Sequence, residues 1–253
     1  MIILKNSGQL AIMRKAGRIT GDALRLAQER IKPGMTTKEL DTIIEKYIRS
    51  KGAKPSFLGY GGFKGSACIS INEQVIHGIP SAKTVIREGD LVKVDVGAFL
   101  DGYHSDAART FAVGKVDELS ERLMKTAERA FYEGMKAAVV GNRIGDVANA
   151  VQRTVEAEGF SVVTEYIGHG VGQELHEQPS VPNYGEPGHG CRLCEGMTIA
   201  IEPMINAGTS HVMRLSDGWT VLTRDMKRSA HYENTIAITK NGPVILTAPT
   251  AED

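Results

Sequence analysis

The chain has 253 residues, 42% of them hydrophobic, which is enough for one large domain or two small ones with a buried core. Thirty Lys and Arg residues balance thirty Asp and Glu residues, and without an excess of cations we expect no specific binding of nucleic acid. Three cysteines are too few for a disulfide framework; we expect no signal peptide, because the first apolar run is short, and no apolar run reaches about 18 residues. These features predict a cytoplasmic protein without a membrane span.

The first part of the chain has the apolar spacing of two helices. In residues 7–31, apolar side chains recur every three or four positions, as on one face of an amphipathic helix. Thr36 and Glu39 then have the spacing of a capping box. This box predicts a second helix, which ends at Gly52.

A β-hairpin is predicted next. Residues 91–97 alternate between two faces, and residues 103–113 form a return strand after a turn at Asp101 and Gly102.

The pattern then starts again. Helical spacing returns in residues 123–138 and 147–158, and strand-like segments occupy the chain from Thr198 onward. Landmarks of the two parts are separated by a constant 107 residues, namely Gly34 and Gly141, Gly52 and Gly159, Gly89 and Gly196, and Asp95 and Glu202. Two further pairs, His77 with His176 and Asp106 with Glu233, recur in the same order but at other offsets.

These matches predict an internal duplication within a single catalytic domain, residues 1–253, with halves at about 1–115 and 116–253. Each half places helices beside a mainly antiparallel sheet, so the fold class is α+β. We expect a functional site where the two halves meet.

Paired carboxylates point to a cation. Asp95 and Asp106 are symmetric about the turn of the hairpin, which predicts that they lie directly opposite each other. Two ionised carboxylates at that distance repel unless a proton or a cation lies between them. The alternative is that one Asp faces solvent, as most Asp residues do.

The second half adds Glu202 and Glu233, each within an apolar strand-like segment. Four carboxylates from two hairpins are able to hold two metal ions, and a two-metal centre is suited to hydrolysis.

Histidines complete the candidate site. His169 lies between glycines, where the backbone is able to approach a ligand closely, and His77 and His176 are the matched histidines of the two halves. The remaining histidines are predicted to be ordinary surface or core-edge residues; they are His104, His189, His211 and His231. With one imidazole and several carboxylates, the metal could be Mn, Fe, Co or Zn.

Longer strings together resemble the type I methionine aminopeptidases over essentially the whole chain. These strings are ACISINE at 67–73, HGIP at 77–80, GHGVG at 168–172, HEQP at 176–179, IEPM at 201–204, DGW at 217–219 and YENT at 232–235, with Asp95 and Asp106 between them.

The resemblance implies a pita-bread fold and a two-metal site that removes the initiator methionine from peptides and nascent chains, with a preference for a small second residue. By similarity, Asp95 would bind one divalent ion, His169 and Glu202 the other, and Asp106 and Glu233 both. Glu202 would also be the general base, and His77 and His176 would contact the substrate and the tetrahedral intermediate.

The resemblance further implies a methionine pocket with walls from Tyr60, Phe63, Cys68 and Trp219, since a thioether packs well against aromatic faces. Leu175 and Phe57 depart from residues that are common in the family. We expect a monomer that makes at most transient contact with the ribosome.

Two other features invite different interpretations. Lys93 shares a strand face with Asp95 and would compete with a metal if it turned inward, so we expect it to point away. Cys191 and Cys194 form a single CxxC pair, which without a second pair predicts a plain loop rather than a zinc or redox site.

Two rival functions remain. Prolidases and Xaa-Pro aminopeptidases share the same five ligands, but usually carry a further N-terminal domain that this chain is not expected to have. A non-catalytic binding protein with the same fold is the second rival; such proteins typically lose ligands, and all five are present here.

Overall fold

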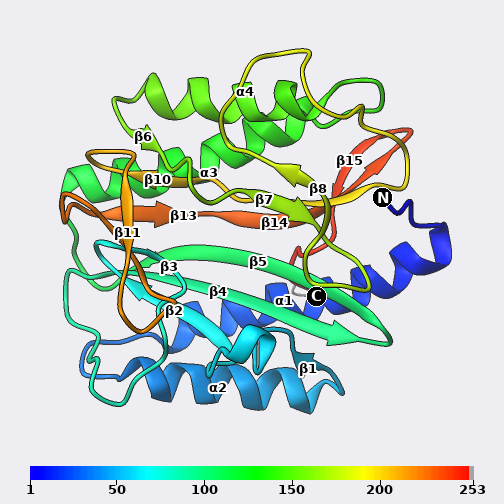
Figure 1. The fold of residues 1–253 in the computed structure, drawn as a ribbon. Helices are drawn as coiled ribbons and strands as arrows, with labels where there is room; N and C mark the ends of the chain where they lie inside the picture. The colour runs from blue at the N-terminus through cyan, green and yellow to red at the C-terminus, as the bar shows by residue number, and fades with distance from the viewer. Residues whose placement is uncertain (251–253) are drawn as a thin grey trace.

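A computed structural model of the protein describes residues 1–250, and Figure 1 shows its chain path. Four long helices carry the predicted spacing, and both of the first two begin with a capping box, at Asn6 and at Thr36. The helix predicted at 147–158 begins three residues earlier. The helices are α1 (Ser7–Arg30), α2 (Thr37–Ser50), α3 (Glu118–Ala137) and α4 (Ile144–Glu156), with a short 3-10 turn η1 (Tyr60–Gly62).

The strands form one large sheet and two small ones. The large antiparallel sheet has the order β1-β4-β5-β14-β9-β7-β8, with β2 joined to β4 and β15 joined to β14. Its strands are β1 (Lys54–Pro55), β2 (Ala67–Ile71), β4 (Leu91–Leu100), β5 (Tyr103–Ala112), β7 (Gly168–Gly170), β8 (Glu177–Val181), β9 (Thr198–Ile201), β14 (Glu233–Thr239) and β15 (Gly242–Ile245). The small sheets are β13-β10-β6 and β11-β12-β3, formed by β3 (Gln74–Ile76), β6 (Ser161–Val162), β10 (Met204–Asn206), β11 (Val212–Arg214), β12 (Val221–Thr223) and β13 (Ser229–His231).

The helices lie on the outside of the strands. In Figure 1, α1 and α2 are below the strands and α3 and α4 are above them. Each helix pair has its own apolar core: one core joins α1 and α2 to β2 and β4, and the other joins α3 and α4 to β9 and β14. Between the two cores, β5 of the first half pairs with β14 of the second.

The two parts of the chain share turns at the constant offset seen in the sequence. The three matched glycine pairs have nearly equal positive φ angles: 88° and 97° at Gly34 and Gly141, 77° and 75° at Gly52 and Gly159, and 84° and 86° at Gly89 and Gly196. Two isolated β-bridges, Thr36 to Val85 and Arg143 to Arg192, are also related by the same offset. A side chain with Cβ is strained at such φ angles, so the matched glycines mark turns that both halves need.

The predicted hairpin forms, but its register differs from the prediction. Asp95 pairs with Ala108, and Asp106 pairs with Gly97. The reason is the turn: β4 runs on to Leu100, which pairs with Tyr103, so the hairpin is centred one residue later than expected. Because the shift between partners is two residues, both carboxylates still point to the same face, as diagonal neighbours.

Within residues 1–250, no helix combines the length and the apolar character needed to cross a membrane.

Candidate metal centre and methionine pocket

Three of the predicted metal donors lie in one row across the large sheet. Ala108 of β5 pairs with Asp95 of β4 on one side and with Glu233 of β14 on the other. Glu202 extends the row, because the pairs that flank it, Ile201 with Asn234 and Met204 with His231, share one register. Asp95, Glu233 and Glu202 therefore come from strands far apart in the sequence and still face the same side.

A second row lies next to the first. Asp106 is two residues from Ala108 on β5, and His169 lies on β7, whose next residue pairs with β9. The His169 Nε2 atom is 3.5 Å from Glu202 Oε1 and 3.7 Å from Asp106 Oδ2. All five predicted donors thus converge where the two halves meet.

The tautomer of His169 suits a metal ligand. Its Nδ1 atom is 2.9 Å from the carbonyl oxygen of Gly170. A carbonyl only accepts, so Nδ1 must carry the proton, and the lone pair of Nε2 is left facing the carboxylates. A Cβ at Gly170 would lie 2.4 Å from the Gln178 carbonyl oxygen, so β8 packs this closely on β7 only because residue 170 is a glycine.

Burial makes the carboxylate cluster costly without a cation. It raises the pKa of Asp95 to about 7, and burial together with the neighbouring carboxylates raises the pKa values of Asp106, Glu202 and Glu233 well above normal. One buried oxygen each of Asp95, Asp106 and Glu233 has no hydrogen-bond partner among residues 1–250. Oxygen and imidazole donors with unused lone pairs fit a divalent cation.

The donor atoms fall into two overlapping groups. Asp106, His169 and Glu233 each offer an atom within 4.8 Å of the others, and so do Asp95, His231 and Glu233. Glu233 belongs to both groups. Glu202 belongs to neither group, although its carboxylate lies close to His169 and His231.

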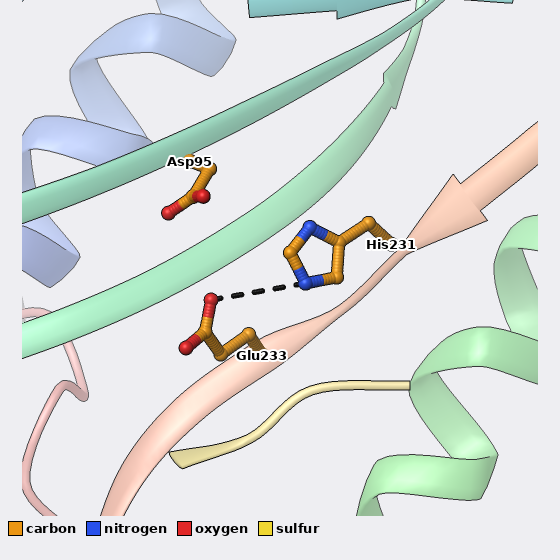
Figure 2. A group of neighbouring side chains, drawn as sticks. All are labelled: Asp95, His231 and Glu233. Atoms are coloured by element: carbon orange, nitrogen blue, oxygen red, sulfur yellow. Dashed lines mark ion pairs between the residues drawn. The ribbon is translucent and has the colours of Figure 1, made fainter. Parts of the chain in front are cut away.

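His231 is the residue that the sequence prediction missed. It was expected to be an ordinary histidine, but it is buried and its Nε2 atom lies 3.8 Å from both Glu202 Oε2 and Glu233 Oε2. Figure 2 shows its ring beside Glu233 and facing Asp95. The available signal was its position two residues before Glu233, because strand side chains two apart share a face.

The matched histidines, His77 and His176, line the cavity beside the carboxylates. His77 follows β3 with a φ of 59°, in the left-handed region that few residues other than glycine adopt. Burial lowers its pKa to about 4, with a smaller contribution from His176. His77 is therefore neutral at pH 7 and carries one N–H donor.

His176 is held by a tyrosine. Its Nδ1 atom is 2.7 Å from the hydroxyl oxygen of Tyr60, and its ring centroid is 4.2 Å from that of His169. Partial burial lowers the pKa of His176. When the Tyr60 hydroxyl donates to Nδ1, the proton of the neutral ring is on Nε2.

The segment before His176 is tied to the N-terminal end of the chain. The Glu177 carboxylate accepts from the backbone N–H of Gln173 at 2.8 Å and forms a buried ion pair with Lys5. Lys5 also donates its backbone N–H to Gly196. This buried pair fixes the loop in which His176 lies.

The residues predicted to form the walls of a methionine pocket lie together. The four residues, Tyr60, Phe63, Cys68 and Trp219, line the same cavity as the carboxylates, and the departing residues Phe57 and Leu175 line it too. Burial raises the pKa of the Cys68 thiol well above normal, so it acts as an apolar wall. The sequence prediction missed three further wall residues, Ile76, Tyr166 and Ile167.

Lys93 is fully buried rather than solvent-facing. Its ammonium donates to the carbonyl oxygens of Asn72 at 2.6 Å and Ser229 at 3.1 Å. The prediction that it points away from Asp95 holds in this sense: main-chain carbonyls, not carboxylates, accept its hydrogen bonds.

The other singled-out residues lie outside the centre. Cys191 and Cys194 are free thiols in a loop, in neither three-donor group of the described chain. His189 and His211 are exposed, and the His104 Nδ1 atom is 2.9 Å from the Ser56 hydroxyl.

The sequence matches metallopeptidase family M24 over residues 11–240. The chain belongs to this family. A methionine aminopeptidase of Clostridium perfringens is 53% identical over 98% of this chain and 99% of that protein. Methionine aminopeptidase 1 of Bacillus subtilis is 50% identical, again over 98% of this chain and 99% of the relative.

Solved structures of M24 enzymes agree with the fold. The crystal structure of methionine aminopeptidase from Thermotoga maritima has a TM-score of 0.97 at 45% identity and covers 98% of this chain and 100% of that chain. The prolidase from Pyrococcus furiosus has a TM-score of 0.79 at 28% identity, and 66% of its chain is covered. The α+β pita-bread fold is therefore confirmed, and the similarity to methionine aminopeptidases is the stronger one.

Proposed function

We propose that this chain is an aminopeptidase that removes the N-terminal methionine of peptides and nascent proteins by metal-dependent hydrolysis. The observation that carries the proposal is that the five carboxylate and imidazole donors share one cavity with the apolar, aromatic pocket. Such a pocket suits a thioether side chain, and the donors adjoin it where the first peptide bond would lie. The high identity to methionine aminopeptidases over the whole chain supports the same function.

In this proposal, Asp95 would hold one divalent ion, His169 and Glu202 would hold a second, and Asp106 and Glu233 would serve both. Ions held there would lower the pKa of a water molecule and polarise the scissile carbonyl. The unpartnered carboxylate oxygens support the assignment. Mn, Fe, Co and Zn all suit these donors.

The protein residues then move and hold protons. Glu202 accepts the proton of the attacking water and passes it to the leaving amine. His176 presents an Nε2–H to the developing oxyanion while Tyr60 holds its other nitrogen, and the neutral His77 supplies a second donor.

The resemblance to the family extends the proposal to a preference for small second residues. A comparison of Met-Gly with Met-Leu peptides tests this point. Faster cleavage of Met-Leu peptides would contradict it.

All five donors belong to one chain, which supports an active monomer made of a single domain. The free thiols suit the cytoplasm, and contact with the ribosome would be transient because the net charge is zero.

The deciding experiment measures methionine release from Met-Gly-Met-Met after chelation and after addition of Mn, Fe, Co or Zn. Ala-Pro and Gly-Pro peptides are assayed in parallel. Release of methionine only with metal supports the proposal. Cleavage confined to the proline peptides would favour a prolidase, and metal binding without cleavage would favour a non-catalytic protein.

A further inference from the structure

The backbone of His231 is fixed on the face that carries the carboxylates. Its N–H donates to Thr110 Oγ1 at 2.9 Å, and the Thr110 hydroxyl donates back to its carbonyl at 2.8 Å. On the other edge, His231 pairs with Met204 of β10. These backbone contacts hold the imidazole on the side of the sheet that carries the carboxylates.

The ring has no conventional partner at this position. His231 is 1% exposed, and neither ring nitrogen has a hydrogen-bond partner within the described chain. An unsatisfied buried polar group is costly. The Nε2 distances of 3.8 Å to Glu202 and to Glu233 are too long for hydrogen bonds.

These distances do fit two donors of one ion. Donor atoms that are each about 2.1 Å from a metal lie at most about 4.2 Å apart. The His169 Nε2 atom lies at similar distances from two carboxylate oxygens, 3.5 Å from Glu202 Oε1 and 3.7 Å from Asp106 Oδ2. Glu202 turns one oxygen to each ring, Oε1 to His169 and Oε2 to His231.

We propose that His231 is a nitrogen ligand of the metal centre, so that each of the two ions is bound by one imidazole. One ion would then have His169 and Asp106 among its ligands and the other His231 and Asp95, while Glu233 belongs to both groups. The inference rests on the proposed function, since it adds a ligand to the site proposed there.

A nitrogen donor changes the metal preference of the ion beside Asp95. Imidazole suits Fe, Co and Zn, whereas an all-carboxylate site suits Mn. Substitution of His231 should therefore weaken the binding of Co and Zn more than the binding of Mn at one of the two sites.

The test counts imidazole ligands. The chelated full-length protein is titrated with Co²⁺ and followed by proton NMR, in which the ring N–H of a cobalt-bound histidine gives a strongly shifted exchangeable signal. We expect two such signals at two equivalents of Co²⁺ in the wild type and one in His231→Gln. Calorimetry should show a loss of Co²⁺ affinity of at least about 10-fold at one site only.

His211→Gln is the matched control, because His211 is exposed and lies outside both three-donor groups of residues 1–250. It should keep both signals and both affinities. A single shifted N–H in the wild type with two Co²⁺ ions bound would overturn the ligand role, and this readout does not depend on whether a variant folds.

Methionine release from the same cobalt-loaded wild type separates the two proposals. Normal release with one imidazole signal refutes only the role of His231. Two signals without release keep the ligand and refute the proposed function.

Discussion

Glu233 is the side chain whose loss should affect both ions, because it belongs to both three-donor groups. Glu233→Ala should lower methionine release by more than about 100-fold, since even residues behind metal ligands contribute roughly 10–100-fold. Bound metal, measured by atomic absorption, should fall as well, while circular dichroism should show a retained fold. Glu133→Ala, at an exposed carboxylate of α3, is the control. Normal turnover in a folded Glu233→Ala protein would refute the assignment.

His77 should matter for turnover but not for metal binding. Removal of one donor to an oxyanion costs about 100-fold or more in kcat, so His77→Ala should lose turnover and keep its metal. Because φ is 59° at this position, His77→Asn is the better-matched variant, as Asn tolerates left-handed backbone. Metal-free His77→Asn protein would show that the residue is a ligand and was misassigned.

At the scale of single residues, the sequence predicted which five donor residues would come together, because their types and order match a family, and the structure places all five in one cavity. His231 was not predicted: its spacing from Glu233 was a signal, but its sequence string matches no family motif, and only the structure shows that its ring is buried beside the carboxylates.

At the scale of elements, α1 shows where helix propensity misleads. Propensity predicts that Gly17→Ala stabilises the helix by about 1 kcal/mol. In the structure, a Cβ on Gly17 would lie 2.1 Å from the Leu246 carbonyl oxygen. We therefore expect destabilisation of about 1–3 kcal/mol, as for overpacked cores.

Gly8→Ala is the control in the same helix, since its Cβ would lie 3.4 Å from Asn6 Oδ1, in ordinary contact. Urea unfolding should place the midpoint of Gly17→Ala well below that of the wild type and leave Gly8→Ala near it. Equal midpoints for the two variants would mean that α1 is not packed on the C-terminal segment as described.

The cap of α3 predicts a dependence on pH. Asp117 accepts from the Ser120 N–H at 2.7 Å, and this bond, with help from Arg228, lowers the pKa of Asp117. A carboxyl with a lowered folded-state pKa stabilises the fold above its unfolded pKa of about 3.9, and this contribution is lost as the pH falls through the folded value.

Asp117→Asn keeps a capping oxygen but removes the charge. It should be less stable than the wild type by a few tenths of a kcal/mol at pH 7, and the difference should shrink toward pH 3. Urea unfolding of both proteins at pH 7, 5, 4 and 3 measures this. A difference that grows on acidification would contradict the cap.

The helices and the hairpin were predictable because caps, turns and apolar spacing are local. The register of the hairpin was not, since the length of β4 is decided by its pairing with β5 and β2. The error of two residues preserved the face and so did not hide the site.

At the scale of the molecule, the metal centre joins the two halves. Asp95 and Asp106 come from the first half, and His169, Glu202 and Glu233 from the second. Ions that bind only the folded chain should stabilise it by about 2.7 kcal/mol at 100 times their dissociation constant. Calorimetric melting in EDTA and with increasing Mn²⁺ or Co²⁺ should show a rising midpoint, and a midpoint indifferent to metal would contradict the centre.

The sequence by itself determined the helices, the landmarks that repeat along the chain, the candidate donor residues and the family, because capping, periodicity and motif order are local properties of the chain. The tertiary structure decided which side chains meet: the diagonal placement of Asp95 and Asp106, the burial of Lys93 against carbonyls, and the entry of His231 into the cluster. The physical reason is that antiparallel pairing brings residues more than 100 positions apart into one row, and the register of that pairing depends on all the strands together.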